Sequence, residues 1–330
     1  MTLLLLLAAF VLIVVGALGF TNAIEWLGQR LNLAASAVGA LLAAVGTALP
    51  ESMIPVVALA GSSKDAEDIA IGSIIGAPFL LATLAMILVA ASSHGWRGRR
   101  SQGRGLEIDL DGLRRDLTVF LVLFPVGVLL GLGLPHGLRI AGAVVLVIGY
   151  GLYVWRTAKQ SGDAANAEEL RPLRFDTTPE DPPTTLQIVL QLVVSLAAIV
   201  GGAELFVGEV ESVAMSLGLG TLILSLILAP LATELPEKIN SVLWVRQGKD
   251  DLALGNVTGA LTFQAAIPVA IGLAFTEWQL DRFALLASGA AVVGGVIAYF
   301  ALGRRGFGLL PTAAWSVLFA GFVAYAVLAS

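Results

Sequence analysis

Two short stretches, GTALPE at residues 46–51 and ATELPE at residues 232–237, each place a proline and a glutamate inside a long apolar segment. A proline removes a backbone hydrogen bond from a helix. An acidic side chain at the centre of a membrane segment costs roughly 2.5 kcal/mol or more unless it finds a partner or water. The occurrence of both features at two matching positions predicts a polar site in the middle of a membrane bundle.

The composition places the whole chain in a membrane. The 330 residues are 57% hydrophobic and only 13% charged, whereas about a quarter of the residues of a soluble domain are charged. The sequence contains no cysteine, which excludes disulfides and thiolate metal sites. Its two histidines, His94 and His136, lie beside predicted loops, so a His-ligated zinc or haem site inside the membrane is not expected. No basic run with interleaved aromatic residues suggests nucleic-acid binding.

Apolar runs of membrane-spanning length recur along the chain and predict an all-α membrane protein with ten transmembrane helices. The first five lie in residues 1–156 and the second five in residues 186–330, and a polar, proline-rich linker at 157–185 joins these two units. The predicted spans are 2–20, 32–60, 68–91, 116–134, 137–156, 186–208, 217–246, 251–275, 283–302 and 308–328.

Most Lys and Arg residues fall in the loops on one side of these spans, including the linker. The positive-inside rule therefore predicts a cytoplasmic linker and two outside termini. The small size of the chain favours the plasma (inner) membrane of a prokaryote. The sequence gives no indication of the oligomeric state.

The two halves repeat each other. Residues 16–51 align with residues 202–237 without a gap, and DIAIGSIIGA at 68–77 aligns with DLALGNVTGA at 251–260. Because each half has an odd number of spans, the halves are expected to lie in opposite orientations. Inverted repeats with interrupted helices near the midplane are typical of secondary transporters.

The repeated motif offers oxygen ligands for a cation. Two facing carboxylates, Glu51 and Glu237, repel each other unless a cation lies between them, and a charge of −2 on hard oxygens suits calcium. Pro50 and Pro236 have no N–H, so two helical carbonyls lose their partners, and a threonine shares a helix face with each glutamate. The alternative is that the prolines only kink the helices and the threonines bond to their own helices. The predicted ligands are Glu51, Thr47 and the carbonyl of Gly46, with Glu237, Thr233 and the carbonyl of Ala232.

The third and eighth spans are expected to complete the site. Asn256 and Gln264 lie on one face of the eighth span, and Ser73 stands where the first half pairs with Asn256. Glu234 is expected to shape selectivity. Lys238 can pair with Glu234, snorkel to the membrane surface or face another wall of the cavity, and inside the site it could replace one transported cation. The glycines of both spans favour close helix packing over ligation: Gly72, Gly76, Gly255 and Gly259.

These paired motifs resemble those of the calcium/cation antiporter superfamily, in particular the sodium/calcium exchanger family. GTALPE and ATELPE match a family motif of the form G-T-S-L-P-E, and each is followed by the glycine-rich motif described above. The resemblance covers nearly the whole chain and implies exchange of calcium for sodium or protons by alternating access. It also implies that the glutamates and threonines of the motif bind the transported ions.

The chain departs from the family pattern at several polar positions. Ala48 and Glu234 replace motif serines, and Leu81 and Gln264 replace later polar ligands. Sodium sites built from hydroxyls and amides are therefore expected to be fewer or weaker. Further replacements are Ser73 for a motif asparagine, and Ala77 and Ala260 for motif serines.

The sequence thus predicts a cation antiporter, not an enzyme, that has no permanently bound cofactor and transports Ca²⁺ and Na⁺ or H⁺. Its expected partners are inorganic cations and the lipid bilayer, and spans 1 and 6 are expected to move against the ion-binding core. One alternative is a proton-coupled antiporter of another cation, and a second is a non-transporting relative that acts as a sensor or scaffold. An intramembrane protease is disfavoured because the sequence shows no His pair and no Asp in the central spans.

Overall fold

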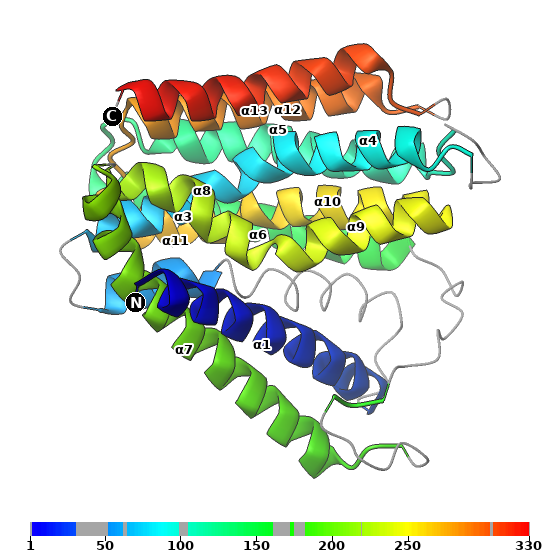
Figure 1. Cartoon of the computed structure of the whole chain (residues 1–330), viewed down its shortest axis with the longest axis horizontal. Helices are drawn as coiled ribbons and strands as arrows, with labels where there is room; N and C mark the ends of the chain where they lie inside the picture. The colour runs from blue at the N-terminus through cyan, green and yellow to red at the C-terminus, as the bar shows by residue number, and fades with distance from the viewer. Residues whose placement is uncertain are drawn as a thin grey trace.

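The computed structural model describes residues 2–30, 52–61, 65–98, 105–160, 172–174, 182–218, 220–303 and 306–329, and every regular element in these ranges is a helix. Residues 52–60 form a helix that carries no label in Figure 1. The others are α1 (Thr2–Arg30), α3 (Ala66–Leu80), the π-helix η1 (Leu81–Ala85), α4 (Met86–Gly95), α5 (Leu110–Leu130), α6 (His136–Gln160), α7 (Thr185–Leu217), α8 (Thr221–Thr233), α9 (Leu235–Gln247), α10 (Asp250–Gln264), α11 (Ile267–Phe275), α12 (Arg282–Ala301) and α13 (Leu309–Ala329).

The protein is a multi-pass membrane protein. Within the described part of the chain, seven stretches of helix are long and apolar enough to cross a bilayer. The predicted second span, 32–60, lies mostly outside the described residues. The seven stretches are Leu3–Phe20, Ala66–Gly95, His136–Thr157, Thr185–Val210, Asp250–Phe275, Arg282–Ala301 and Leu309–Ala329.

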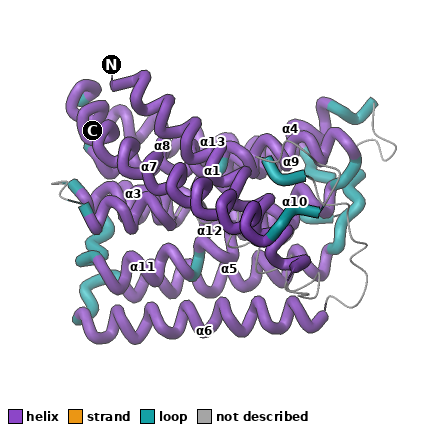
Figure 2. The backbone as a smooth tube through the Cα atoms, turned by 90° about the horizontal axis from the view of Figure 1, so that it is seen from below, coloured by secondary structure: helices purple, strands orange, loops and turns teal. Residues whose placement is uncertain are grey.

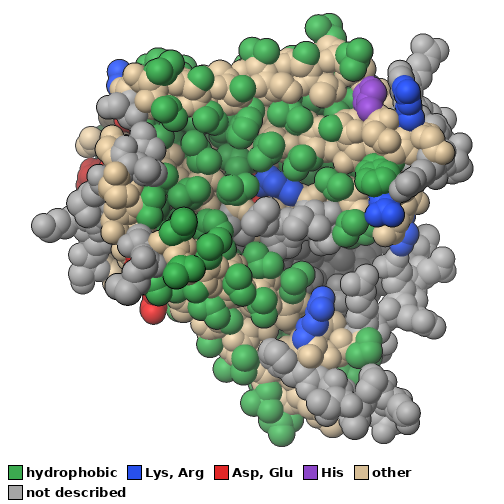
Figure 3. Space-filling view, in the orientation of Figure 1, with side chains coloured by type: hydrophobic (Ala, Val, Ile, Leu, Met, Phe, Trp, Pro, Cys, Tyr) green, Lys and Arg blue, Asp and Glu red, His purple; other side chains and the backbone are tan. Residues whose placement is uncertain are grey.

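The helices form one bundle in which α1 and α7 lie together and are inclined to the others (Figure 1). The two ends of the chain lie at the same end of the bundle (Figures 1 and 2). Apolar side chains cover much of the face in Figure 3, while Lys and Arg gather toward the end away from the chain termini. Large apolar side chains such as Val144, Val193 and Phe300 are exposed, as expected of a lipid-facing surface.

Helices α1 and α7 pack backbone to backbone through two equivalent glycines. A methyl group on Gly16 would lie 2.8 Å from the carbonyl oxygen of Ser195 and 2.8 Å from Cγ1 of Ile199. A methyl group on Gly202 would lie 3.0 Å from the carbonyl oxygen of Ala9 and 2.8 Å from Cγ1 of Ile13. The gap-free alignment of the halves pairs Gly16 with Gly202 and, extended toward the N-terminus, pairs the two contacted positions as well. Exchange of the two halves therefore maps this interface onto itself.

The predicted packing role of the first pair of motif glycines is confirmed. A methyl group on Gly72 would lie 2.8 Å from the carbonyl oxygen of Leu222, and one on Gly76 would collide with the carbonyl of Leu226. Both contacted residues belong to α8, so the lack of a side chain at Gly72 and Gly76 allows α3 and α8 to approach closely.

In the part of the chain that the structure describes, three spans contain an interruption. Helix α8 ends at Thr233 and α9 begins at Leu235, which confirms the interruption predicted at the second Pro-Glu motif. The other two interruptions were not predicted: α3 continues as the π-helix η1 from Leu81, and α10 ends at Gln264. The alignment of the halves pairs Leu81 with Gln264, so both spans lose regular α-helical structure at the same point of the repeat.

Candidate cation-binding site

The interruption between α8 and α9 lies near the middle of the predicted seventh span, 217–246. Glu234 follows Thr221, the first residue of α8, by a helical length of roughly 20 Å, and Gln264 lies a similar distance along α10 from Asp250. Glu234 itself has a non-helical backbone, with φ −96° and ψ 3°. Pro236 in the first turn of α9 has no N–H to donate to the carbonyl of Ala232. The sequence therefore opens the helix far from both ends of the predicted span.

Three polar side chains meet at this interruption. The Lys238 ammonium contacts Oε2 of Glu234, and the two side chains are only 3% and 1% exposed. Nε2 of Gln264 donates to Oε1 of the same carboxylate at 2.8 Å, and Gln264 is fully buried. Lys238 therefore pairs with Glu234 and does not snorkel to the membrane surface, which decides between the alternatives that the sequence left open.

The amide face predicted on α10 does turn toward the broken span. Nδ2 of Asn256 lies 3.4 Å from the hydroxyl of Ser241 on α9, and that hydroxyl donates to the carbonyl of Ala253 at 3.2 Å. Helix α10 thus contacts the α8–α9 segment through polar side chains at two places along its length, at Asn256 and at Gln264. These contacts position the backbone around the interruption.

Two predicted ligands form hydrogen bonds within their own helices. The buried Thr233 hydroxyl donates to the carbonyl of Ala229 at 3.2 Å, which is the alternative considered for this residue. The buried Ser73 hydroxyl donates to the carbonyl of Ala70 at 2.9 Å in α3. In both cases the oxygen keeps lone pairs that can accept a cation.

The remaining predicted ligands fall on parts of the chain that the structure does not cover. Gly46, Thr47 and Glu51 lie outside the described residues, and so do the side chains of Ala232 and Glu237. The backbone of Glu237 lies in the first turn of α9, next to Lys238. Among the side chains that are described, no group of three or more Asp, Glu, His or Cys could hold a metal ion.

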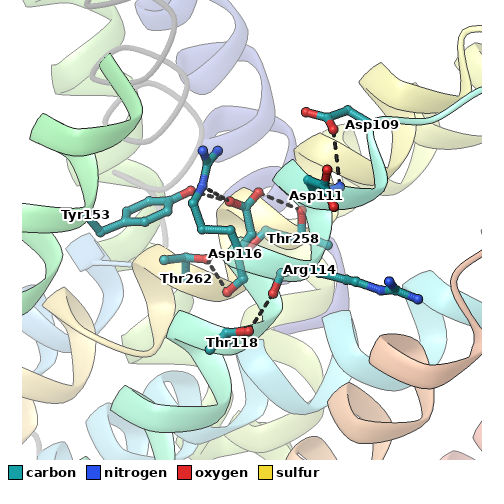
Figure 4. Close-up of polar contacts among 9 residues, drawn as sticks. Asp109, Asp111, Arg114, Asp116, Thr118, Tyr153, Thr258 and Thr262 are labelled. Atoms are coloured by element: carbon teal, nitrogen blue, oxygen red, sulfur yellow. Dashed lines mark hydrogen bonds and ion pairs between the residues drawn. The ribbon is translucent and has the colours of Figure 1, made fainter. Parts of the chain in front are cut away.

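A second buried polar cluster surrounds Asp116 in α5 (Figure 4). Its carboxylate accepts hydrogen bonds from the Tyr153 hydroxyl at 2.8 Å and the Thr258 hydroxyl at 3.0 Å, and Nε of Arg115 lies 3.6 Å away. The Thr262 hydroxyl lies 3.2 Å from the backbone carbonyl of Asp116. These residues come from α5, α6 and α10, so the cluster joins three helices on the side of α10 away from Glu234.

The sequence interpretation missed this cluster. It began the fourth span at residue 116, which made Asp116 a flanking charge, but α5 begins at Leu110 and carries Asp116 inside the bundle with a side chain 11% exposed. The available signal was the spacing of Thr258 and Thr262, which places two hydroxyls on one face of the eighth span. The statement that the central spans contain no Asp is therefore corrected.

The architecture is that of known cation exchangers. A crystal structure of the H⁺/Ca²⁺ exchanger CAX superposes with a TM-score of 0.74 at 20% identity and covers 98% of this chain and 81% of that chain. The sodium-calcium exchanger NCX_Mj superposes with a TM-score of 0.62 at 22% identity and covers 98% of this chain and 99% of that chain. In sequence, the chain is 25% identical over 291 residues to the inner membrane protein YrbG of Escherichia coli (strain K12), across 85% of this chain and 82% of YrbG.

The fold and the interrupted, polar span define a multi-pass transporter of cations. The sequence model of the sodium/calcium exchanger protein family matches residues 1–158 and 187–329. The chain belongs to that family, and it is a membrane cation antiporter.

Proposed function

We propose that this antiporter exports calcium from the cytoplasm in exchange for sodium or protons by alternating access. The observation that carries the proposal is the interruption at Glu234, where buried polar side chains converge in the middle of an apolar bundle. Buried ionisable groups at that depth are rare and mark ion pathways. Membership of the exchanger family supports the same conclusion.

The proposed site joins the two Pro-Glu motifs. Glu237, the Thr233 hydroxyl and the carbonyl of Ala232 bind the ion from the second half, and Asn256 and Gln264 support them from α10. The first half contributes Glu51, Thr47, the carbonyl of Gly46 and Ser73. The two carboxylates balance a calcium ion, which prefers oxygen ligands in flexible geometry.

The proposed architecture is ten transmembrane helices in two inverted repeats, residues 1–156 and 186–330, with the linker 157–185 between them. The reciprocal contacts of Gly16 and Gly202 support this arrangement, because they exchange when the halves are exchanged. The paired interruptions at Leu81 and Gln264 support it as well. The family model also matches two segments and leaves 159–186 unmatched.

The proposed location is the plasma membrane of a prokaryote, with both termini outside and the linker in the cytoplasm. The two chain ends lie at the same end of the bundle, whereas α4 and α9 end at the opposite end (Figure 1). At that opposite end the guanidinium of Arg246 stacks over the ring of Trp96 at 4.8 Å. A basic, aromatic boundary of this kind suits the cytoplasmic membrane surface.

The test is uptake of radioactive calcium into proteoliposomes under an outward sodium gradient and, separately, an outward proton gradient. We expect uptake with one gradient and loss of nearly all uptake in Glu51→Gln and Glu237→Gln variants. Glu277→Gln is the matched control, because its side chain is 70% exposed in the loop after α11, away from the proposed site. Uptake that persists in both site variants would contradict the assignment of the ligands.

The two gradients also separate the alternatives. Uptake driven by protons alone indicates a proton-coupled exchanger, and the same assay with other cations tests whether calcium is the substrate. Folded protein that moves no cation under either gradient would contradict transport and favour a sensor or scaffold.

A further inference from the structure

The Glu234–Lys238 pair lies inside the proposed cation path. Lys238 directly follows the proposed ligand Glu237, and Glu234 stands at the interruption itself. The ammonium and carboxylate are 3% and 1% exposed, so neither charge is solvated by bulk water. Because a buried charge needs a partner, these two residues satisfy each other.

The pair keeps a free cation away from Glu234. One carboxylate oxygen contacts the Lys238 ammonium, and the other accepts the amide hydrogen of Gln264 at 2.8 Å. The ammonium is attached to the same segment one helical turn away, so it cannot diffuse away as a bound ion can. A free monovalent cation can therefore reach Glu234 only by displacing a tethered one.

Gln264 retains one open oxygen at this place. Its Nε2 atom is engaged by Glu234, while its Oε1 atom is buried and has no hydrogen-bond partner among the described atoms. An amide oxygen is a neutral ligand for sodium or calcium. The cluster thus adds an oxygen ligand to the site without adding net charge.

We propose that the Lys238 ammonium is a built-in cation that permanently fills the place of one monovalent ion, so that the exchange of calcium for monovalent cations is electroneutral. This inference rests on the function proposed above. The charges of Glu51 and Glu237 sum to −2, and those of Glu234 and Lys238 sum to zero. One calcium ion or two monovalent cations then balance the site, and no net charge moves in a cycle.

The built-in cation is a property of one half of the chain. The alignment pairs Glu234 with Ala48 and Lys238 with Ser52, so the first half carries neither charge at these positions. The built-in cation therefore depends on a single pair, and that pair can be removed without altering the first repeat.

The first measurement uses the unmodified protein in proteoliposomes with a fixed gradient of the driving cation and a membrane potential set by potassium and valinomycin. We expect the final calcium ratio across the membrane to stay unchanged when the potential is varied. If one net charge moved per cycle, a potential of about 59 mV would shift that ratio tenfold. A tenfold shift would overturn the built-in cation while leaving calcium exchange intact, whereas no calcium movement under any gradient would overturn both proposals.

The second measurement compares Lys238→Gln with Glu234→Gln/Lys238→Gln. The single variant leaves Glu234 without a counter-charge, so its site takes one additional monovalent cation, and the Hill coefficient for the driving cation is expected to rise from about two to about three. The double variant removes both charges of the pair, which sum to zero. Its Hill coefficient for the driving cation is expected to be about two again, and its transport should still be independent of the membrane potential. An active single variant with an unchanged coefficient would overturn the proposal. If the single variant does not fold, potential-dependent exchange by the double variant would overturn it instead, and potential-independent exchange would support it.

Discussion

Replacement of Asp116 by alanine tests how the second buried cluster holds α10 in place. The side chain of Asp116 accepts hydrogen bonds from Tyr153 at 2.8 Å and from Thr258 at 3.0 Å, and Thr258 is fully buried. In Asp116→Ala both hydroxyls lose the acceptor that they share. Each stranded polar group costs about 1–3 kcal/mol, so we expect the free energy of unfolding to fall by about 2–6 kcal/mol.

Removal of the Tyr153 hydroxyl, one of the two donors, is expected to lower the free energy of unfolding much less than removal of the Asp116 carboxylate. Tyr153→Phe deletes one hydrogen bond between membrane helices, which contributes on average about 0.6 and at most about 1.7 kcal/mol. Because the stranded hydroxyl disappears with the tyrosine, Asp116→Ala/Tyr153→Phe should be more stable than the sum of the single losses predicts. The coupling in this double-mutant cycle is expected to be about 0.5–3 kcal/mol.

The assay is equilibrium unfolding of the purified protein in mixed micelles, followed by tryptophan fluorescence. Thr118→Ala is the matched control, because its exposed hydroxyl bonds only to its own helix, at the carbonyl of Arg114 (Figure 4). A loss below about 1 kcal/mol in Asp116→Ala, or strictly additive single losses, would refute the conclusion that Asp116 joins α5, α6 and α10.

Two further predictions concern the core of the bundle. Gly76→Ala places a methyl group against the backbone of Leu226, so we expect the free energy of unfolding to fall by about 1–3 kcal/mol. The yield of monodisperse protein in size-exclusion chromatography should fall as well. Gly151→Ala is the control and should leave the yield unchanged, because no described atom lies within 4 Å of its added methyl group. Gln264→Leu removes the amide that donates to Glu234 and also removes the unpartnered amide oxygen. Calcium uptake should fall, and the free energy of unfolding should fall by about 1–3 kcal/mol. Normal uptake and stability would show that the amide is dispensable.

Much of the fold could be predicted from the sequence because the bilayer imposes strong constraints on length and hydropathy. The spans that contain α6, α12 and α13 were predicted to within a few residues, since each is a continuous apolar run. The interruption at Glu234 was predictable because proline and an acid together leave few alternatives inside a membrane. The π-helix at Leu81 was not predictable, because nothing in its apolar sequence distinguishes it from regular α-helix.

The candidate site was predicted less completely, because tertiary partners decide the role of each polar residue. The spacing of Glu234 and Lys238 allowed a pair, yet only their burial shows that the lysine does not reach the membrane surface. Asp116 was missed because it directly follows Arg114 and Arg115 at the edge of the predicted span and was taken as a flanking charge. Its contacts with Tyr153 and Thr258 come from distant parts of the sequence. The ligand roles of Glu51 and Glu237 remain predictions.

The paired glycines of α1 and α7 have a mechanical consequence. These helices interlock backbone to backbone, and Gln191 adds hydrogen bonds to the carbonyl of Gly19 and to Asn22, both at 2.9 Å. Where the pair meets α8, by contrast, it does so through a cluster of apolar side chains that includes Phe206 and Leu224. Apolar surfaces can slide past each other without breaking directional bonds. Helices α1 and α7 can therefore move together, as one rigid body, along the apolar surface of α8.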